Sequence, residues 1–283
     1  MEYRHIIYLP GKTARIILNR QRYLNAQSYL MLEEIDSAIC AAVKDPECGA
    51  IVLSGLGRAF SVGHDIGTEE DNIYKKEHGY GSSGDLDVSK WFEGMRKLYI
   101  DYTLAWKNIS KPTIAMVHGY CIFGGWMVAA AMDVIFAAED AQFLPGFVEY
   151  FSTPYDIGFR RAREILFEHR FMTAREAYNY GFVNRVFDAE SLEKETLQYA
   201  ERVAENYLDF PSWVKMCKFS INHMEEAMGF NTEIGSAFNN FCLMSATRSK
   251  AMAPPSEGGF ARTNMAKKHF QLSLPWLKKA DMV

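Results

Sequence analysis

The stretch Thr113-Ile-Ala-Met-Val-His-Gly-Tyr-Cys-Ile-Phe-Gly-Gly-Trp-Met127 decides the fold. An apolar, β-branched run from Thr113 to Val117 leads through a glycine turn to the pair Gly124 and Gly125, which precede an apolar helical run. Strand, small-residue turn and helix in this order are typical of α/β proteins, in which ligands bind at the carboxyl ends of strands. Gly124 would then lie at a helix N-terminus, where free N–H groups favour negative charge.

A second glycine bend follows an earlier strand signal. Ala59-Phe-Ser-Val-Gly-His-Asp-Ile-Gly67 comes soon after the apolar run Ile51–Leu53. If the two bends lie side by side, their backbone N–H groups converge on one point, and such a pair stabilises the oxyanion of a thioester enolate or of a tetrahedral intermediate. The alternative is that both bends are tight turns that merely need glycine.

The rest of the sequence extends the α/β pattern. Short β-rich runs at Ile6–Leu9 and Ala14–Leu18, a helical pattern over Ser28–Val43 and a buried strand at Ala50–Leu53 indicate a βαβ arrangement. From Thr173 onward the periodicity is mostly helical. The sequence therefore predicts an α/β part followed by a helical part.

One segment lacks this periodicity. Residues Gly67 to Asp87 are rich in Glu, Lys, Gly and Ser and contain few apolar residues. Because such a segment buries little apolar area, we expect a mobile loop or lid there.

Composition excludes several function classes. The chain has 283 residues, and its hydrophobic content of 48% is typical of a globular protein. Its net charge of -4 argues against a nucleic-acid partner. Its five cysteines contain no CxxC pair, which favours a reducing compartment over a disulfide framework. No two histidines have HxxxH spacing, so we predict no metal site.

Membrane association is not expected either. The N-terminus has no long apolar stretch, and the longest apolar run, Cys121–Phe136, is interrupted by two glycines and by Asp133. It falls short of the roughly 18 to 20 residues that cross a bilayer. We therefore predict a cytoplasmic protein with no membrane partner.

Five stretches in the right order carry a family resemblance. They are Leu18-Asn-Arg-Gln-Arg-Tyr-Leu-Asn-Ala26, Phe60-Ser-Val-Gly-His-Asp-Ile66, Lys111-Pro-Thr-Ile-Ala-Met-Val-His-Gly119, Gly124-Gly125 with Asp133–Phe143, and Thr173–Val186. Together they resemble the motifs of the crotonase superfamily, also called the enoyl-CoA hydratase/isomerase family. Each motif alone is weak, but their combination and order are specific.

The resemblance implies a fold and an assembly. The family fold is a spiral of ββα units, expected here over residues 1–195. A helical C-terminal part, expected over residues 196–283, serves trimerisation in the family. We therefore expect a homotrimer or homohexamer, and the apolar stripe from Phe238 to Met244 is a candidate contact.

The resemblance also implies site residues. The backbone N–H groups of His64 and Gly124 would form the oxyanion hole for a thioester carbonyl. No cofactor is implied beyond the coenzyme A of the substrate. The residues expected to line the CoA and substrate groove are Arg22, Tyr23, Leu24, Asp65, Ile66, Gly67, Trp126 and Met127.

The sequence departs from the family at its two catalytic glutamates. One of these positions is Met127, and an ungapped count places Gly146 at the other. Methionine cannot transfer a proton, so hydration by the usual pair of carboxylates is not supported. The segment Gly146–Gly158 supplies replacement candidates, and in a second register with a shortened loop Asp156 takes the place of the acid. The sequence alone does not choose between the two registers.

The catalytic candidates are therefore Asp156, Glu149 and Tyr150, with Tyr155 as a further tyrosine. The alternative for Glu149 is a solvated surface charge, and for Asp156 a helix N-cap before Gly158. The side chain of His64 could add a donor or base at the mouth of the site, and the alternative is an exposed loop histidine.

Aromatic residues near the expected acyl pocket predict a bulky, cyclic or aromatic acyl group if they converge, and ordinary core packing if they do not. They are Trp91, Phe92, Phe123, Trp126, Phe147, Tyr150 and Phe151. The sequence thus predicts an acyl-CoA enzyme of the hydratase/isomerase type. The alternatives are a carbon–carbon hydrolase or lyase on a cyclic acyl-CoA and a non-catalytic acyl-CoA binding protein.

Overall fold

Two sheets form the body of the molecule in the computed structural model, which describes residues 2–80 and 88–251. The six-stranded sheet has the order β1 (Ile6–Leu9), β2 (Thr13–Leu18), β3 (Ala50–Gly55), β5 (Thr113–Val117), β7 (Val134–Ala138) and β10 (Arg185–Phe187). The four-stranded sheet has the order β4 (Ala59–Ser61), β6 (Tyr120–Ile122), β8 (Gln142–Leu144) and β9 (Met172–Thr173).

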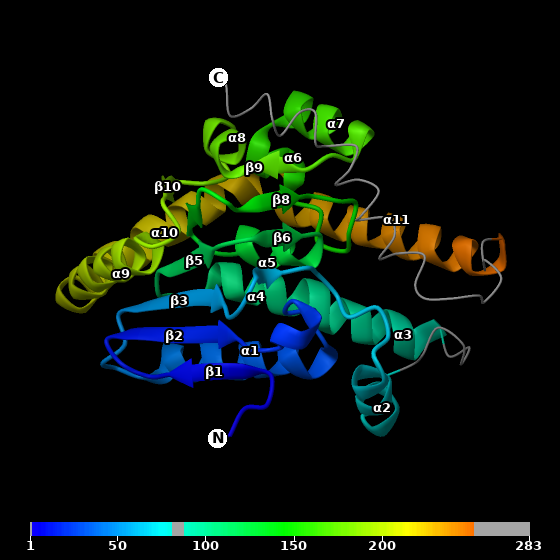
Figure 1. Cartoon of the computed structure of the whole chain (residues 1–283), viewed down its shortest axis with the longest axis horizontal. Coiled ribbons are helices and arrows are strands. Elements are labelled where there is room, and N and C mark those ends of the chain that lie inside the picture. The colour runs from blue at the N-terminus through cyan, green and yellow to red at the C-terminus, as the bar shows by residue number, and fades with distance from the viewer. Residues whose placement is uncertain (1, 81–87, 252–283) are drawn as a thin grey trace.

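The strands follow a spiral. β3, β5 and β7 are parallel neighbours in the first sheet, and each is followed in the chain by β4, β6 or β8, which are parallel neighbours in the second. Each turn of the chain therefore adds one strand to each sheet, as the stacked arrows of Figure 1 show. The α/β spiral that the sequence predicted is confirmed.

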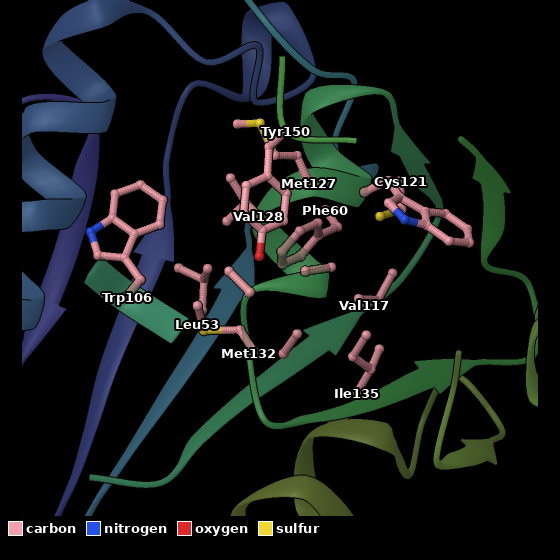
Figure 2. Packing of buried hydrophobic residues seen from close by; sticks show 14 of the residues in the cluster. Leu53, Phe60, Trp106, Val117, Cys121, Met127, Val128, Met132, Ile135 and Tyr150 are labelled. Atoms are coloured by element: carbon pink, nitrogen blue, oxygen red, sulfur yellow. The ribbon is translucent and has the colours of Figure 1, made fainter. Parts of the chain in front are cut away.

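Helices cover the sheets and connect the turns of the spiral. They are η1 (Gln21–Tyr23), α1 (Tyr29–Lys44), α2 (Glu69–Glu77), α3 (Val88–Met95), η2 (Arg96–Asp101), α4 (Tyr102–Asn108), α5 (Gly124–Ala130), α6 (Thr153–Ile157), α7 (Phe159–Glu168), α8 (Ala174–Asn179), α9 (Leu192–Asp209), α10 (Pro211–Ala227) and α11 (Phe230–Ala251). α1 buries Leu32, Ile35 and Ile39 in the main apolar core, part of which Figure 2 shows. On the other face of the six-stranded sheet, α9 packs Ala200 and Ala204 against a second cluster.

The prediction of a loop over residues 67–87 is wrong for its first half, because α2 occupies Glu69–Glu77. Polar contacts explain this helix better than apolar periodicity does. The side chain of Thr68 accepts a hydrogen bond from the N–H of Asp71 and caps the helix. The buried carboxylate of Asp71 in turn accepts a hydrogen bond from the N–H of Tyr29, at 2.8 Å. Residues 81–87 lie outside the described part of the chain.

The C-terminal part departs from the expectation in three details. β10 adds a strand in a region where only helices were expected. α9 runs through residue 195 and lies on the sheet, so the boundary between the two parts stays a prediction. In the stripe from Phe238 to Met244, Phe238 and Cys242 are buried in the chain's own core, whereas Leu243 is exposed.

All five cysteines are free thiols. Within residues 2–80 and 88–251, no helix is long and apolar enough to cross a membrane.

Candidate active site

The two glycine bends lie against each other. β4 and β6 are parallel neighbours, so the chain leaves both strands at the same edge of the sheet. Gly63 has a φ of +92°, and a Cβ atom placed on it would lie 3.0 Å from the nitrogen of Gly124 and 2.8 Å from the carbonyl oxygen of Ile122. Only a glycine allows this close approach.

Two backbone N–H groups at this contact find no acceptor in the part of the chain that the structure describes. Among the described residues, neither the N–H of His64 nor that of Gly124 donates to a backbone or side-chain oxygen. Gly124 is the first residue of α5, so the helix provides no carbonyl for it. The preceding Phe123 has φ 47° and ψ -104°, a strained conformation for a residue with a side chain. The bend is thus held in a costly shape that leaves two donors free.

The side chain of His64 lies directly over Gly124. A Cβ atom on Gly124 would come within 2.7 Å of His64 Nδ1. The other ring nitrogen, Nε2, lies 3.0 Å from Glu149 Oε2, and the Tyr99 ring lies 3.9 Å from the imidazole, centroid to centroid. Nδ1 is buried and has no hydrogen-bond partner among the described residues.

Gln27 ties the two bends together. Its backbone N–H donates to the carbonyl of Gly63 at 2.8 Å, and its carbonyl accepts from the N–H of Asp65 at 2.9 Å. Its side-chain amide donates to the carbonyl of Gly124 at 3.0 Å. Neither Gln27 nor Tyr99 is predicted as a site residue from the sequence, because nothing in their local sequence indicates contacts 97 and 35 positions away.

Asp156 lies at a second polar point, beside α5. Its Oδ2 atom accepts hydrogen bonds from Trp126 Nε1 at 2.8 Å and from Ser152 Oγ at 2.7 Å. Burial raises the pKa of Asp156 to about 6, although both hydrogen bonds oppose the shift. The N-cap alternative is wrong, because Asp156 lies within α6 and the N-cap of α7 is Gly158.

The other candidates also have definite places. Glu149 is only 3% exposed and pairs with His64, so the alternative of a solvated surface charge is wrong. Tyr150 is buried, and its hydroxyl has no partner among the described residues. Burial, aided by the nearby charge of Asp156, raises the pKa of that hydroxyl. Tyr155 Oη instead donates to the carbonyl of Met228, at 3.2 Å.

Met127 and Gly146, the positions that an ungapped count assigns to the family's glutamates, are both closely packed. Met127 is fully buried in the main core, among the residues labelled in Figure 2. A Cβ atom on Gly146 would lie 2.5 Å from the Phe123 ring, so a larger residue would require this ring to move.

Most of the chain matches a known protein family. A family model described as Enoyl-CoA hydratase/isomerase matches residues 10–250. The chain belongs to this family. Its fold is that of the crotonase superfamily, as the sequence motifs indicated.

Several family members are similar over most of this chain. EchA13 of Mycobacterium tuberculosis, whose name as an enoyl-CoA hydratase is provisional, is 32% identical over 250 residues, 81% of this chain and 76% of its own. The 4-chlorobenzoyl coenzyme A dehalogenase-2 of an Arthrobacter species is 30% identical over 200 residues, 68% of each chain. The crystal structure of a probable enoyl-CoA hydratase from Mycobacterium smegmatis superposes with a TM-score of 0.76 at 32% identity, covering 87% of this chain and 97% of that one.

Within this family fold, Trp126 and Met127 of the expected groove residues lie in α5 and are buried, and the others lie in η1 or next to the bend at Gly63. Arg22 and Tyr23 belong to η1, and Leu24 ends it with φ 50° and accepts a hydrogen bond from the N–H of Val62. Arg22 is exposed, and Ile66 is 39% exposed. These residues form an accessible edge next to the free N–H groups.

Asp65 has a different environment from the rest of that group. Its carboxylate is buried and forms an ion pair with Arg20, 2.9 Å away. Burial alone would raise its pKa, but hydrogen bonds from Thr68, Gly67 and Arg20 outweigh burial and lower it. Its side chain holds the loop between the bend and α2.

The seven aromatic candidates separate into groups. Trp126 stacks on Phe182 with 3.6 Å between ring centroids, and Phe92 contacts Phe238, so both belong to the core. Phe147 contacts Phe151 and Phe241, and it is 37% exposed. Trp91 is partly buried against the main core.

No group of three or more His, Cys, Asp or Glu residues within the described ranges is arranged to hold a metal ion.

Proposed function

We propose that this family member acts on an acyl-CoA thioester whose carbonyl oxygen accepts hydrogen bonds from the N–H groups of His64 and Gly124. The observation that carries the proposal is the contact between the two bends, which leaves both donors without an acceptor. Donors of this kind stabilise the negative charge that develops on the oxygen, and each is worth about 10²- to 10³-fold in rate.

Proton transfer is assigned to Asp156. A group with a pKa of about 6 can both take up and release a proton near neutral pH. The unpartnered hydroxyl of Tyr150 lies close enough for the charge of Asp156 to affect its pKa, so it is the group proposed to assist. The reaction class is isomerisation or hydration of the acyl chain through an enolate.

The acyl group is proposed to be bulky or cyclic. The seven aromatic candidates do not converge on one pocket, so the aromatic support is limited to Tyr99, whose ring packs on His64, and Phe123, whose Cβ atom lies beside Gly63. A similar protein named a 4-chlorobenzoyl coenzyme A dehalogenase is consistent with an aromatic thioester. Arg22, Tyr23, Leu24, Ile66 and Gly67 are proposed to contact the CoA portion.

The active form is proposed to be a homotrimer or a dimer of trimers. α10 supports this because it has no buried residue and exposes large apolar side chains, including Trp213, Met216 and Met224. Several large apolar side chains exposed on one helix favour an interaction site there. The compartment is proposed to be the cytoplasm, since a reducing environment suits five free thiols.

A carbonyl-labelled thioester tests the proposal directly. Binding should shift the infrared stretch of the labelled thioester carbonyl to lower frequency, because two N–H donors weaken the C=O bond. Turnover is then measured on a panel of linear, cyclic and aromatic acyl-CoA thioesters. If a cyclic β-oxoacyl-CoA is cleaved, as the product mass would show, the reaction class is carbon–carbon cleavage and not isomerisation or hydration. Binding without any turnover would identify a binding protein, and absence of binding would refute the proposal.

A further inference from the structure

An unexplained polar atom lies at the contact between the two bends. His64 Nδ1 is buried, and no donor or acceptor among the described residues reaches it. Buried polar atoms of folded proteins almost always have a partner, and an exception suggests a bound water, an ion or a functional role. This atom lies against Gly124, whose free N–H group is one of the two proposed oxyanion donors.

The contact with Glu149 determines what the unpartnered nitrogen can do. Glu149 Oε2 lies 3.0 Å from His64 Nε2, and a carboxylate accepts a hydrogen bond, so Nε2 carries a proton. A neutral imidazole has one N–H, and Nδ1 therefore presents a lone pair. In the neutral ring, Nδ1 is thus a base that faces the proposed carbonyl site.

The side chains around His64 and Glu149 bear on the charge of this pair. The titratable side chains that face His64 and Glu149 are Tyr99, Tyr29 and Cys242. Burial raises the pKa of each of these three groups, which stay neutral at neutral pH, and it raises that of Cys242 to about 11. Among these groups Glu149 therefore carries the negative charge that stabilises the imidazolium.

We propose that the imidazole of His64 is a catalytic acid–base group and that Glu149 is the residue that positions it. The inference rests on the proposed acyl-CoA function and adds a second proton carrier to Asp156. Tyr99 packs against the ring and Glu149 fixes its tautomer, so Nδ1 has a defined direction. Glu149, a candidate for direct proton transfer on sequence grounds, acts here through His64.

The step that this geometry supports is proton transfer next to the thioester carbonyl. Nδ1 takes a proton from the carbon adjacent to the carbonyl, and the electron pair of the C–H bond becomes the C=C bond of an enolate. The carbonyl π electrons move to oxygen, where the N–H groups of His64 and Gly124 stabilise the charge. The imidazolium then returns the proton to the same carbon or to the far end of the conjugated system. The sequence is balanced without an oxidant, a reductant or a further reactant.

His64→Gln is the test variant, because it removes the acid–base ring and keeps the backbone N–H. We expect thioester binding and the infrared carbonyl shift to persist, while kcat falls by about 10²- to 10⁴-fold. The rise of kcat with pH that reports deprotonation of the imidazole should disappear. His118→Gln is the matched control. Like His64, His118 follows a strand, but its ring lies 2.8 Å from the carbonyl oxygen of Gly57, and this variant should leave kcat unchanged.

Glu149→Gln separates positioning from packing. The glutamine oxygen still accepts from Nε2, but the negative charge that stabilises the imidazolium is lost. We therefore expect kcat to fall while KM for the thioester stays unchanged, a split that a purely structural contact would not produce.

Two results would overturn the inference while leaving the proposed function intact. One is a His64→Gln variant that binds thioester, shifts its carbonyl and retains full kcat with the same pH profile. The other comes from ¹⁵N NMR of the unaltered protein, which tests the inference even if the variant fails to fold. A neutral ring with its proton on Nδ1 would exclude the proposed base. If the unaltered protein does not bind the thioester and does not shift its carbonyl stretch, both proposals are refuted.

Discussion

At the scale of single residues, Asp156 shows how burial changes a carboxyl group. The ordinary pKa of 3.8 rises to about 6 because desolvation outweighs the hydrogen bonds from Ser152 and Trp126. The unfolded chain therefore releases this proton at lower pH than the folded chain does. As pH rises through this window, the folded state loses stability relative to the unfolded state.

Asp156→Asn should accordingly stabilise the protein above that window. The amide cannot ionise, so at pH 7.5 we expect a gain of up to about 3 kcal/mol in the free energy of unfolding. The gain should shrink as the pH is lowered toward 4, and turnover should be lost at every pH. Urea unfolding across this range measures the gain, and the control is Asp140→Asn at an exposed position. A variant that is less stable at pH 7.5 would contradict the raised pKa.

At the scale of elements, α10 contacts the rest of the chain partly through polar groups and exposes large apolar side chains. Its contacts with the rest of the chain include polar ones, such as Lys218 Nζ with Asp133 Oδ2 at 2.8 Å and Asn222 Nδ2 with the carbonyl of Lys107 at 3.2 Å. Trp213 and Met224, which helical spacing places on the opposite side, are 72% and 68% exposed. A helix with its apolar side outward indicates a further binding surface.

Trp213→Glu should therefore dissociate the assembly. We expect the unaltered protein to sediment as a trimer or hexamer, and the variant to shift toward single chains of 32.3 kDa, because a charge is costly in an apolar contact. Phe167→Glu is the control, since Phe167 is 82% exposed but lies on α7. Sedimentation velocity at matched concentrations distinguishes the species. If the unaltered protein sediments as a single chain, the trimer proposal is wrong.

At the scale of the whole molecule, the site depends on the spiral. Gly63 follows β4 and Gly124 follows β6, and the two bends meet only because these strands are neighbours in one sheet. Successive turns of the chain thus supply one N–H group each. The geometry of the candidate site is therefore a property of the packed spiral rather than of either bend.

Gly63→Ala tests this contact. The new Cβ atom would press on the nitrogen of Gly124 at 3.0 Å, besides requiring a positive φ. Gly181→Ala is the matched control, because Gly181 has a φ of +88° and open space around its Cα. Both variants should lose about 1–2 kcal/mol of stability from the backbone conformation. Only Gly63→Ala should also abolish the infrared carbonyl shift, and equal effects of the two variants on this shift would contradict the model of two converging donors.

Local sequence patterns were sufficient for most of the fold. Apolar periodicity located α1, the spacing of strand signals and glycines predicted both bends, and the family resemblance implied the crotonase-like spiral. The same approach failed at α2, because that helix depends on the Thr68 cap and on the contact between Asp71 and Tyr29. Polar contacts between distant residues leave no periodic pattern in the sequence.

The sequence by itself determined the family, the fold class and the residue types available at each bend, since these follow from short-range spacing and from motifs. Only the tertiary structure decided which groups work together. Glu149 meets His64 across 85 positions, Trp126 bonds Asp156 across 30, and Nδ1 of His64 stays unpartnered over Gly124. The physical reason is that these pairings depend on how successive turns of the spiral stack, which brings together side chains whose local sequences carry no sign of one another.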